Sequence, residues 1–357
     1  MRVRTVLISS VLALALLAVG CAGGQSGGSG GGGDEGGGGG GGTAEVRPAL
    51  VLDVGGLGDQ SFNDSAYAGL QRAKQEFNVE TETLESSSPT DYVDNLTQLA
   101  DSGYNPVFAV GFLMTDALNE VAPQYSDTNF AIVDSVVEPQ NAASLVFREQ
   151  EGSYLAGVVA GLMTQESTEY TNPDDKVVGF LGGQESDLIG KFQAGYEAGV
   201  ESVCSDCEVL VQYAGSTPDA FNDPARGKEI SLQQINQGAD IIYHASGATG
   251  AGLFEAAGEK SIFAIGVDAD QAKLFPDAPI LTSVVKRVDN AVFQTIEQTR
   301  GGFPGGKVVE FGLDDKGISL APFGRFDDDV PQSVKDQVDE AQQGIIDGDI
   351  KVPDKVQ

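Results

Sequence analysis

Short runs of apolar, mostly β-branched residues alternate with longer amphipathic stretches along the chain from residue 46 onward. The runs have the length of strands buried on both faces, and the amphipathic stretches repeat their apolar residues at helical spacing. The predicted strands are 49–54, 106–111, 130–134, 176–182, 240–245, 261–267 and 279–285. The predicted helices are 63–77, 92–102, 150–163, 187–204, 224–238 and 289–301. This alternation predicts an α/β fold with parallel sheets that helices cover on both faces.

The predicted pairs of strand and helix are too many for one compact sheet. We therefore expect two doubly wound lobes, with a first boundary near residues 147–151. Ligands of open α/β sheets bind beyond the carboxyl ends of the strands. The residues that directly follow each apolar run are thus the candidate site.

The start of the chain has a different character. Arg2 and Arg4 precede an apolar stretch over 6–19, which is the layout of a secretory signal and is too short to span a bilayer comfortably. Cys21 follows it in the manner of a lipoprotein lipidation site, although Ala18 stands where leucine is usual. We expect residues 1–20 to be a signal peptide for general export and Cys21 to be lipidated. The alternative is a cleaved signal with a free cysteine.

The segment after this cysteine consists mainly of glycine. Such a segment cannot bury surface, so we interpret residues 21–45 as the lipidated cysteine and a flexible tether that spans about 25–30 Å. No strand, helix or lysine flanks the glycines, which excludes a phosphate-binding loop. The functional body would then stand away from a membrane and remain mobile.

Acidic residues outnumber basic ones by 53 to 21, and the formal net charge is −32. Nucleic acids and anionic lipids bind clustered Lys and Arg, so the composition argues against both as partners. Such a surface repels itself at ordinary salt and is screened at molar salt, which we interpret as adaptation to concentrated brine. No stretch fits a calcium-binding loop, and the single histidine argues against a His-based zinc site.

Residues 53–63 form the most informative strand end. Their glycines suggest a dinucleotide fingerprint, but the G-x-G-x-x-G spacing is absent and Asp59 would repel a pyrophosphate. A structural interpretation makes the glycines turn residues and one of Asp59, Ser61 or Asn63 the cap of the next helix. Capping does not explain Phe62, an aromatic ring at the mouth of the sheet on which a planar ligand could stack.

Polar residues also follow later strands. Asp268 and Lys286 could form a plain ion pair, or a clamp in which the carboxylate accepts from two hydroxyl groups and the ammonium donates to the ligand. His244 has no nucleophilic serine or cysteine beside it. We therefore interpret it as a buried, hydrogen-bonded residue and not as a base.

Cys204 and Cys207 form a lone C-x-x-C pair. Zinc would need two further ligands, which the spacing does not supply. A local disulfide and two free thiols both stay open.

Five separated motifs resemble one family. In chain order they are D-x4-G-D-x-S-F-N at 53–63, F-R-E-x-E-G-S-Y-L-A-G at 147–157, H-A-x-G-x-T-G at 244–250, G-V-D-x-D-Q at 266–271 and S-x-x-K-R at 283–287. Over roughly residues 48–325 the chain resembles the basic membrane protein family of lipoproteins, the purine nucleoside receptor A-like substrate-binding proteins of ABC importers. The resemblance implies the type I periplasmic-binding-protein fold, in which two lobes joined by three crossovers close on a ligand.

The resemblance also implies a nucleoside, with purines expected, as the ligand. The positions that match the family's ligand-binding residues are Asp53, Phe62, Asn63, Asp134, Gly247, Asp268 and Lys286. Phe62 would stack on the base, and Asp268 and Lys286 would lie on the ribose side. Phe221 is expected as the second stacking ring, with Tyr243 as its rival, because 216–220 resembles a small insertion relative to the family pattern.

We therefore expect a monomeric receptor, anchored by Cys21 to the outer face of the cell membrane, that passes its ligand to the permease of an ABC transporter. No catalysis, cofactor or metal is expected. One lobe would comprise 46–150 with 269–306, and the other 151–268 with 307–357. The same fold could instead bind a sugar or another small polar ligand, for transport or signalling. A nucleoside hydrolase would need a catalytic acid or a metal cluster that Asp268 and its neighbours do not supply.

The charge predicts that stability depends on salt. The melting temperature should climb steeply between about 0.1 and 2 M NaCl or KCl, because the Debye length falls from about 10 Å to below about 3 Å and self-repulsion is screened. Thermal melts across this range measure the effect. A flat curve would contradict the adaptation to brine.

Overall fold

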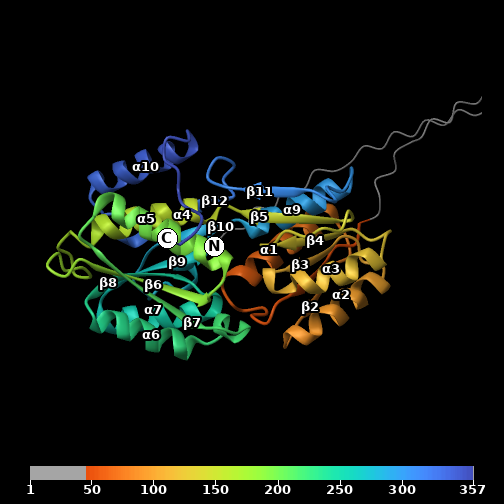
Figure 1. Cartoon of the computed structure of the whole chain (residues 1–357), viewed down its shortest axis with the longest axis horizontal. Helices are drawn as coiled ribbons and strands as arrows, with labels where there is room; N and C mark the ends of the chain where they lie inside the picture. Colours follow the sequence, from red (N-terminus) through yellow and green to blue (C-terminus); the bar gives the residue numbers. More distant parts are fainter. Residues whose placement is uncertain (1–45, 357) are drawn as a thin grey trace, which may run out of the picture. The chain divides into compact units, whose positions relative to one another are not determined.

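The computed structural model describes residues 46–356, and Figure 1 labels its elements. The strands are β1 (Ala49–Leu52), β2 (Glu82–Glu85), β3 (Val107–Val110), β4 (Phe130–Val133), β5 (Ala142–Phe147), β6 (Val177–Gln184), β7 (Glu208–Gly215), β8 (Ala239–Ala245), β9 (Phe263–Asp268), β10 (Ile280–Lys286), β11 (Val308–Phe311) and β12 (Ile318–Leu320). The α-helices are α1 (Phe62–Phe77), α2 (Tyr92–Asp101), α3 (Thr115–Val121), α4 (Glu149–Met163), α5 (Asp187–Val203), α6 (Pro224–Asn236), α7 (Gly250–Lys260), α8 (Gln271–Leu274), α9 (Val288–Thr299) and α10 (Gln332–Ile346). The expected signal peptide, the expected lipidation at Cys21 and the glycine-rich tether lie outside the described residues.

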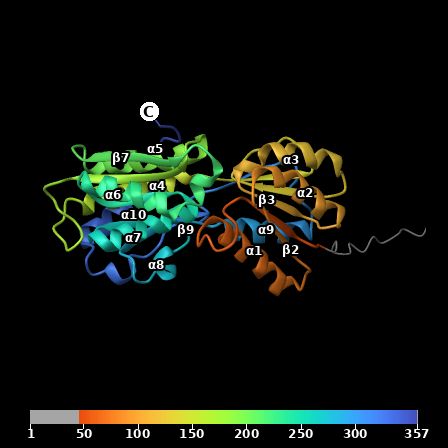
Figure 2. The ribbon, with the colours of Figure 1, turned by 90° about the horizontal axis from the view of Figure 1, so that it is seen from below.

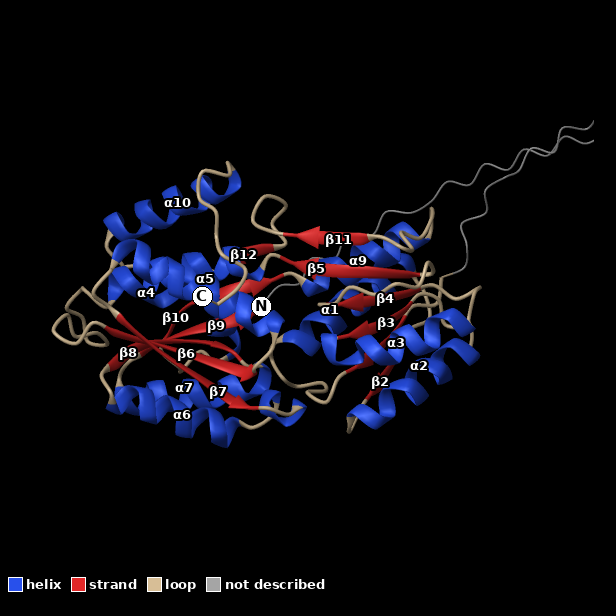
Figure 3. Cartoon of the chain, viewed as in Figure 1, coloured by secondary structure: helices blue, strands red, loops and turns tan. Residues whose placement is uncertain are grey.

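Two six-stranded sheets organise the chain into two lobes (Figure 3). The first sheet has the order β11-β5-β4-β3-β1-β2 and the second has the order β12-β10-β9-β8-β6-β7. The paired strands run parallel, except that β12 is antiparallel to β10. The expected α/β fold with two parallel sheets is thus confirmed.

Helices cover both faces of each sheet, as the continuous burial of β1, β3, β4 and β8 requires. In the first lobe α1 and α9 lie on one face and α2 and α3 on the other (Figure 2). In the second lobe α4 and α5 lie on one face and α6 and α7 on the other (Figure 1). Among residues 46–356, no helix has both the length and the apolar character needed to cross a bilayer.

The chain passes between the lobes at three places. The first is Arg148, between β5 and α4, as expected near 147–151; the second is Arg287, between β10 and α9; and the third is 312–317, between β11 and β12. The division expected at 268/269 and 306/307 was therefore wrong. β10 pairs with β9 and belongs to the second lobe, whereas β11 pairs with β5 and belongs to the first.

The third crossing, together with the residue just before it, is hydrogen-bonded to the first and to the second. The backbone N–H of Arg148 donates to Phe311 at 2.8 Å, and that of Arg287 donates to Gly317 at 2.9 Å. The Arg148 guanidinium forms an ion pair with Glu151 at 2.7 Å and another with Asp314 in the third crossing. These contacts tie the crossings into one hinge region beside the strand ends.

Candidate functional site

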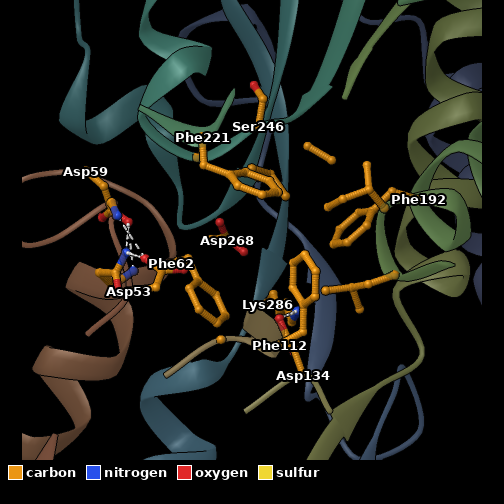
Figure 4. A pocket seen from close by; sticks show the side chains of 18 residues that line it. Asp53, Asp59, Phe62, Phe112, Asp134, Phe192, Phe221, Ser246, Asp268 and Lys286 are labelled. Carbon is orange, nitrogen blue, oxygen red and sulfur yellow. Dashed lines mark hydrogen bonds and ion pairs between the residues drawn. The ribbon is translucent and has the colours of Figure 1, made fainter. Parts of the chain in front are cut away.

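A pocket lies between the lobes, at the carboxyl ends of strands from both sheets (Figure 4). Its lining residues are Asp53, Gly55, Asp59, Phe62, Asn63, Gly111, Phe112, Asp134, Leu188, Ile189, Phe192, Phe221, Ala245, Ser246, Gly247, Val267, Asp268 and Lys286. The structure thus brings together all of the ligand-binding residues expected from the sequence. It adds others to which the sequence assigned no role in binding, notably Phe112, Phe192 and Ser246.

The loop between β1 and α1 is organised by Asp59. Its carboxylate accepts from the backbone N–H groups of Ser61 at 2.9 Å, Asn63 at 2.8 Å and Asp64 at 3.1 Å, and so caps the start of α1. The side-chain amide of Asn63 donates to Asp53 at 2.9 Å and to Asp59 at 3.1 Å. Asn63 therefore fixes the Asp53 carboxylate at the pocket wall. Of the three candidates for the cap, Ser61 holds the N-cap position without a capping bond from its side chain, and the Asp59 carboxylate accepts from the N–H groups in its place.

Four phenylalanine rings line the pocket. Phe62 begins α1 in the first lobe, and Phe221 ends the short 3-10 helix Pro218–Phe221 in the second lobe. Figure 4 shows both rings directed into the same space, together with Phe112 and Phe192. The Phe112 ring meets the Phe221 ring edge-on, with 6.3 Å between centroids. The pocket thus offers flat apolar faces from both lobes to a planar ligand.

Tyr243, the rival second ring, does not line the pocket. Its side chain is fully buried beside the rings of Phe180 and Tyr196, and its hydroxyl is 3.1 Å from that of Ser153. Of the two candidates, only Phe221 is in a position to stack on a ligand in this pocket.

Asp134 and Asp268 occupy equivalent places in the two sheets. Asp134 follows β4 and Asp268 ends β9, and these strands hold the third position in their sheets. Both residues have positive φ angles, of 69° and 64°, a conformation that Asp tolerates better than most side chains. The turn directs both carboxylates toward the pocket.

Lys286 is fully buried at the end of β10. Its ammonium lies 2.6 Å from Asp134 Oδ2 in the first lobe and 3.1 Å from Glu149 Oε1 at the start of α4. It also lies 5.4 Å from the ring centroid of Phe62 and 4.9 Å from that of Phe147. Burial alone would lower the pKa of Lys286, but the surrounding carboxylates raise it, so the ammonium stays charged.

The ion pair that the sequence suggested between Lys286 and Asp268 is replaced by these contacts. The Asp268 carboxylate instead accepts from the hydroxyl of Ser61 in the other lobe. Next to it, the Gln271 side chain donates to the backbone carbonyl of Gln60 at 3.1 Å. The two lobes therefore touch at the edge of the pocket.

His244 is fully buried, as expected. Its ring nitrogens lie 3.2 Å from the Ser246 hydroxyl and 3.0 Å from Gln271 Oε1. Burial lowers its pKa to about 4, so the ring is neutral at physiological pH. Cys204 and Cys207 form a disulfide on the second lobe, which decides between the two alternatives that the sequence left open.

The pocket is rich in hydrogen-bond acceptors. Burial raises the pKa of Asp53 and of Asp134 to about 6 and that of Asp268 to about 7. Asn63 Oδ1 and Asp134 Oδ1 are buried without a hydrogen-bond partner among the described residues. A ligand with several N–H or O–H donors and one flat ring would both pair with these acceptors and stack on the phenylalanine rings. Within residues 46–356, no group of His, Cys, Asp and Glu side chains has the arrangement of a metal site.

Known proteins match this chain over nearly all of its described length. A family model described as ABC transporter substrate-binding protein PnrA-like matches residues 47–356. An ABC transporter nucleoside-binding protein of Lactococcus lactis subsp. cremoris, BmpA, is 37% identical over 333 residues, which cover 87% of this chain and 90% of that protein. A lipoprotein of Pyrococcus abyssi is 34% identical over 324 residues, which cover 87% of this chain and 75% of that protein. The crystal structure of an ABC transporter solute-binding protein from Aeropyrum pernix K1 has a TM-score of 0.76 and 30% identity, and the match covers 86% of this chain and 94% of that one.

Asp268 should make stability depend on pH. Its pKa rises from 3.8 to about 7 on folding, so its stabilising contribution is present at low pH and is lost as the pH rises through this window. Asp268→Asn keeps the shape of the protonated carboxyl but cannot ionise. Relative to the native protein, this variant should gain roughly 1–3 kcal/mol in unfolding free energy between about pH 5 and pH 8.

Denaturant unfolding at a series of pH values measures this difference. Asp206→Asn is the control, because pairing with Lys176 lowers the pKa of that exposed carboxyl, so its contribution to stability changes only at more acidic pH and the profile in this window should match that of the native protein. Parallel pH profiles for the native protein and Asp268→Asn would contradict the prediction.

Proposed function

The chain belongs to the family of PnrA-like substrate-binding proteins of ABC transporters, and we propose that its ligand is a nucleoside. Family membership makes the chain a non-enzymatic receptor that presents a small molecule to a permease, as expected from the sequence. The two-lobed α/β fold is that of the type I periplasmic binding proteins. That the ligand contains a nucleobase and a sugar, and that the chain is anchored by a lipid, is part of the proposal.

The observation that carries the proposal is the pair of Phe62 and Phe221, which come from opposite lobes and point into the same acceptor-rich space (Figure 4). A nucleobase is flat and apolar on its faces and carries N–H donors on its edge. Stacking between aromatic rings is a general way to hold a base, typically worth about 1–3 kcal/mol for each ring.

The polar residues divide into two groups around these rings. Asp53 and Asn63 lie together at the start of α1, where they would accept from or donate to the edge of the base. Asp134, Asp268 and Lys286 lie at the ends of β4, β9 and β10 and would bind the ribose hydroxyls. A carboxylate accepts well from two neighbouring hydroxyls, and an ammonium donates to a hydroxyl oxygen. Gly247 supplies backbone beside Phe221.

Binding would be coupled to movement about the hinge. The lining residues come from both lobes, so a nucleoside completes its contacts only when the lobes close on it. Closure excludes water and strengthens each polar contact to the ligand. Release to the permease would require the reverse movement.

We also propose that the receptor is a monomer that stands outside the cell, tied to the membrane by a lipid on Cys21. The sequence of the first 21 residues and the naming of the Pyrococcus abyssi relative as a lipoprotein support this anchor. Mass spectrometry of the membrane-extracted protein tests it. A diacylglycerol mass on a chain that begins at Cys21 is expected, and an unmodified cysteine would contradict the anchor.

The direct test of ligand class is retention. The purified protein is incubated with radiolabelled purine and pyrimidine nucleosides, free bases and sugars, and bound label is separated by gel filtration. We expect one nucleoside retained for each protein chain and recovered intact. Retention of a sugar alone would reassign the ligand, and recovery of free base from bound nucleoside would contradict a non-enzymatic role.

Phe62→Ala should weaken nucleoside binding by about 1–3 kcal/mol, because it removes one face of the stack. The fold should survive, since this ring is only partly buried at the pocket wall. Calorimetry and a thermal melt measure both quantities, with Phe303→Ala, a partly buried ring of the first lobe away from the pocket, as the control. Unchanged affinity, or a collapse of stability in step with affinity, would argue against the assignment.

A further inference from the structure

Glu149 is a buried carboxylate that sequence reasoning did not assign to the site. It is the first residue of α4, directly after the first crossing, and its side chain is 0% exposed. One carboxylate oxygen lies 3.1 Å from the ammonium of Lys286, and the other lies 3.1 Å from that of Lys191 on α5. We propose that Glu149 is a positioning residue that neutralises Lys286, so that the pocket accepts an uncharged nucleoside and rejects its phosphorylated form.

The charges of the two lysines, Lys286 and Lys191, balance those of the two carboxylates, Asp134 and Glu149. Lys286 lies between Asp134 and Glu149, and Glu149 is shared between Lys286 and Lys191. Lys191 is held in turn by the backbone carbonyl of Phe147, 3.1 Å from its ammonium. Two ammonium groups thus face two carboxylates. Because both carboxylates contact Lys286, its positive charge is compensated before a ligand arrives.

This compensation determines what the pocket can attract. Among the residues that line the pocket in the described part of the chain, Lys286 is the one cation. The other charged lining residues are the carboxylates Asp53, Asp59, Asp134 and Asp268. A phosphate dianion would meet these carboxylates at short range in a water-poor space without an uncompensated positive charge, and so would be repelled. A neutral hydroxyl needs only a hydrogen-bond donor, which Lys286 still provides.

Glu149 reaches the ligand only through Lys286, since it is not among the lining residues. If it were lost, Lys286 would keep Asp134 as its single carboxylate contact, and the region would become more positive by one unit. The ammonium could then turn toward a phosphate. A purely structural role would instead weaken all ligands alike.

The inference rests on the proposed function, so the experiment has an arm with ligand and an arm without. In the first arm, calorimetry compares a nucleoside with its 5′-monophosphate on the native protein, on Glu149→Gln and on Glu255→Gln. Glu255→Gln is the control, because it removes the same charge from an exposed pair with Lys228 at 3.3 Å.

The native protein should bind the nucleoside at least about 100-fold more tightly than the monophosphate. Glu149→Gln should lose about tenfold in nucleoside affinity and should reduce the nucleoside preference by about tenfold or more. Glu255→Gln should keep the native preference. An unchanged preference in Glu149→Gln, or an equal change in the control, would overturn the proposal.

The second arm needs no ligand. Lys286→Met leaves Asp134 and Glu149 facing each other without their shared cation and should lower the melting temperature. Addition of Glu149→Gln should then restore part of the loss, because it removes one of the stranded charges. If the second substitution lowers the melting temperature as much as it does in the native protein, Glu149 does not act on Lys286 and the proposal fails.

The two arms separate the possible failures. If the native protein binds neither ligand, the proposed function is wrong, and the melts still decide whether Glu149 positions Lys286. If Lys286→Met does not fold alone, a cooperative melt of the double variant supports the proposal, and its absence contradicts it.

Discussion

The buried ion pair between Lys286 and Asp134 is the contact on which the site and the hinge both depend. It joins the end of β10 in the second lobe to the end of β4 in the first, at 2.6 Å. Removal of one partner from such a pair strands a charge in the interior, which typically costs about 3–5 kcal/mol. The pair therefore sets how the two lobes are positioned relative to each other beside the second crossing. That position in turn places the pocket walls, including Phe62, whose ring lies near the same ammonium.

The two sheets have corresponding strand orders, so equivalent strand ends meet face to face across the pocket. Asp134 and Asp268 are one equivalent pair, in the same left-handed backbone conformation. The lobes differ at the neighbouring pair of strand ends: β5 ends in the apolar Phe147, whereas its counterpart β10 ends in Lys286. One repeated architecture thus places an acidic residue on each side and a single cation among the lining residues of the described chain.

Much of the fold could be predicted from the sequence because strands buried on both faces read as unbroken apolar runs. The edge strands β2 and β7 escaped prediction because all of their residues are at least partly exposed and polar residues interrupt the apolar pattern. The later lobe boundaries were wrong because local patterns do not show which sheet a strand joins. β10 pairs with β9, the strand before it in the chain, whereas β11 pairs with the distant β5.

The site, like the fold, could be predicted only in part. Residues that directly end a strand, such as Asp134 and Asp268, were accessible to sequence reasoning, and the family resemblance selected among them. Phe112 satisfies the same rule, since it directly follows Gly111 at the end of β3, but the sequence alone assigned it no role in binding. Phe192 and Glu149 lie within helices, where an apolar ring or a carboxylate carries no signal of its own. Only the three-dimensional meeting of Glu149 with Lys286 shows that the charge of the ammonium is already compensated.

A crystal structure of the protein with a bound nucleoside would test this account most directly. We expect the base between Phe62 and Phe221, the ribose hydroxyls on Asp268 and Lys286, and the ammonium still in contact with Asp134 and Glu149. A nucleoside bound elsewhere, or a Lys286 that leaves both carboxylates to reach the ligand, would contradict the account.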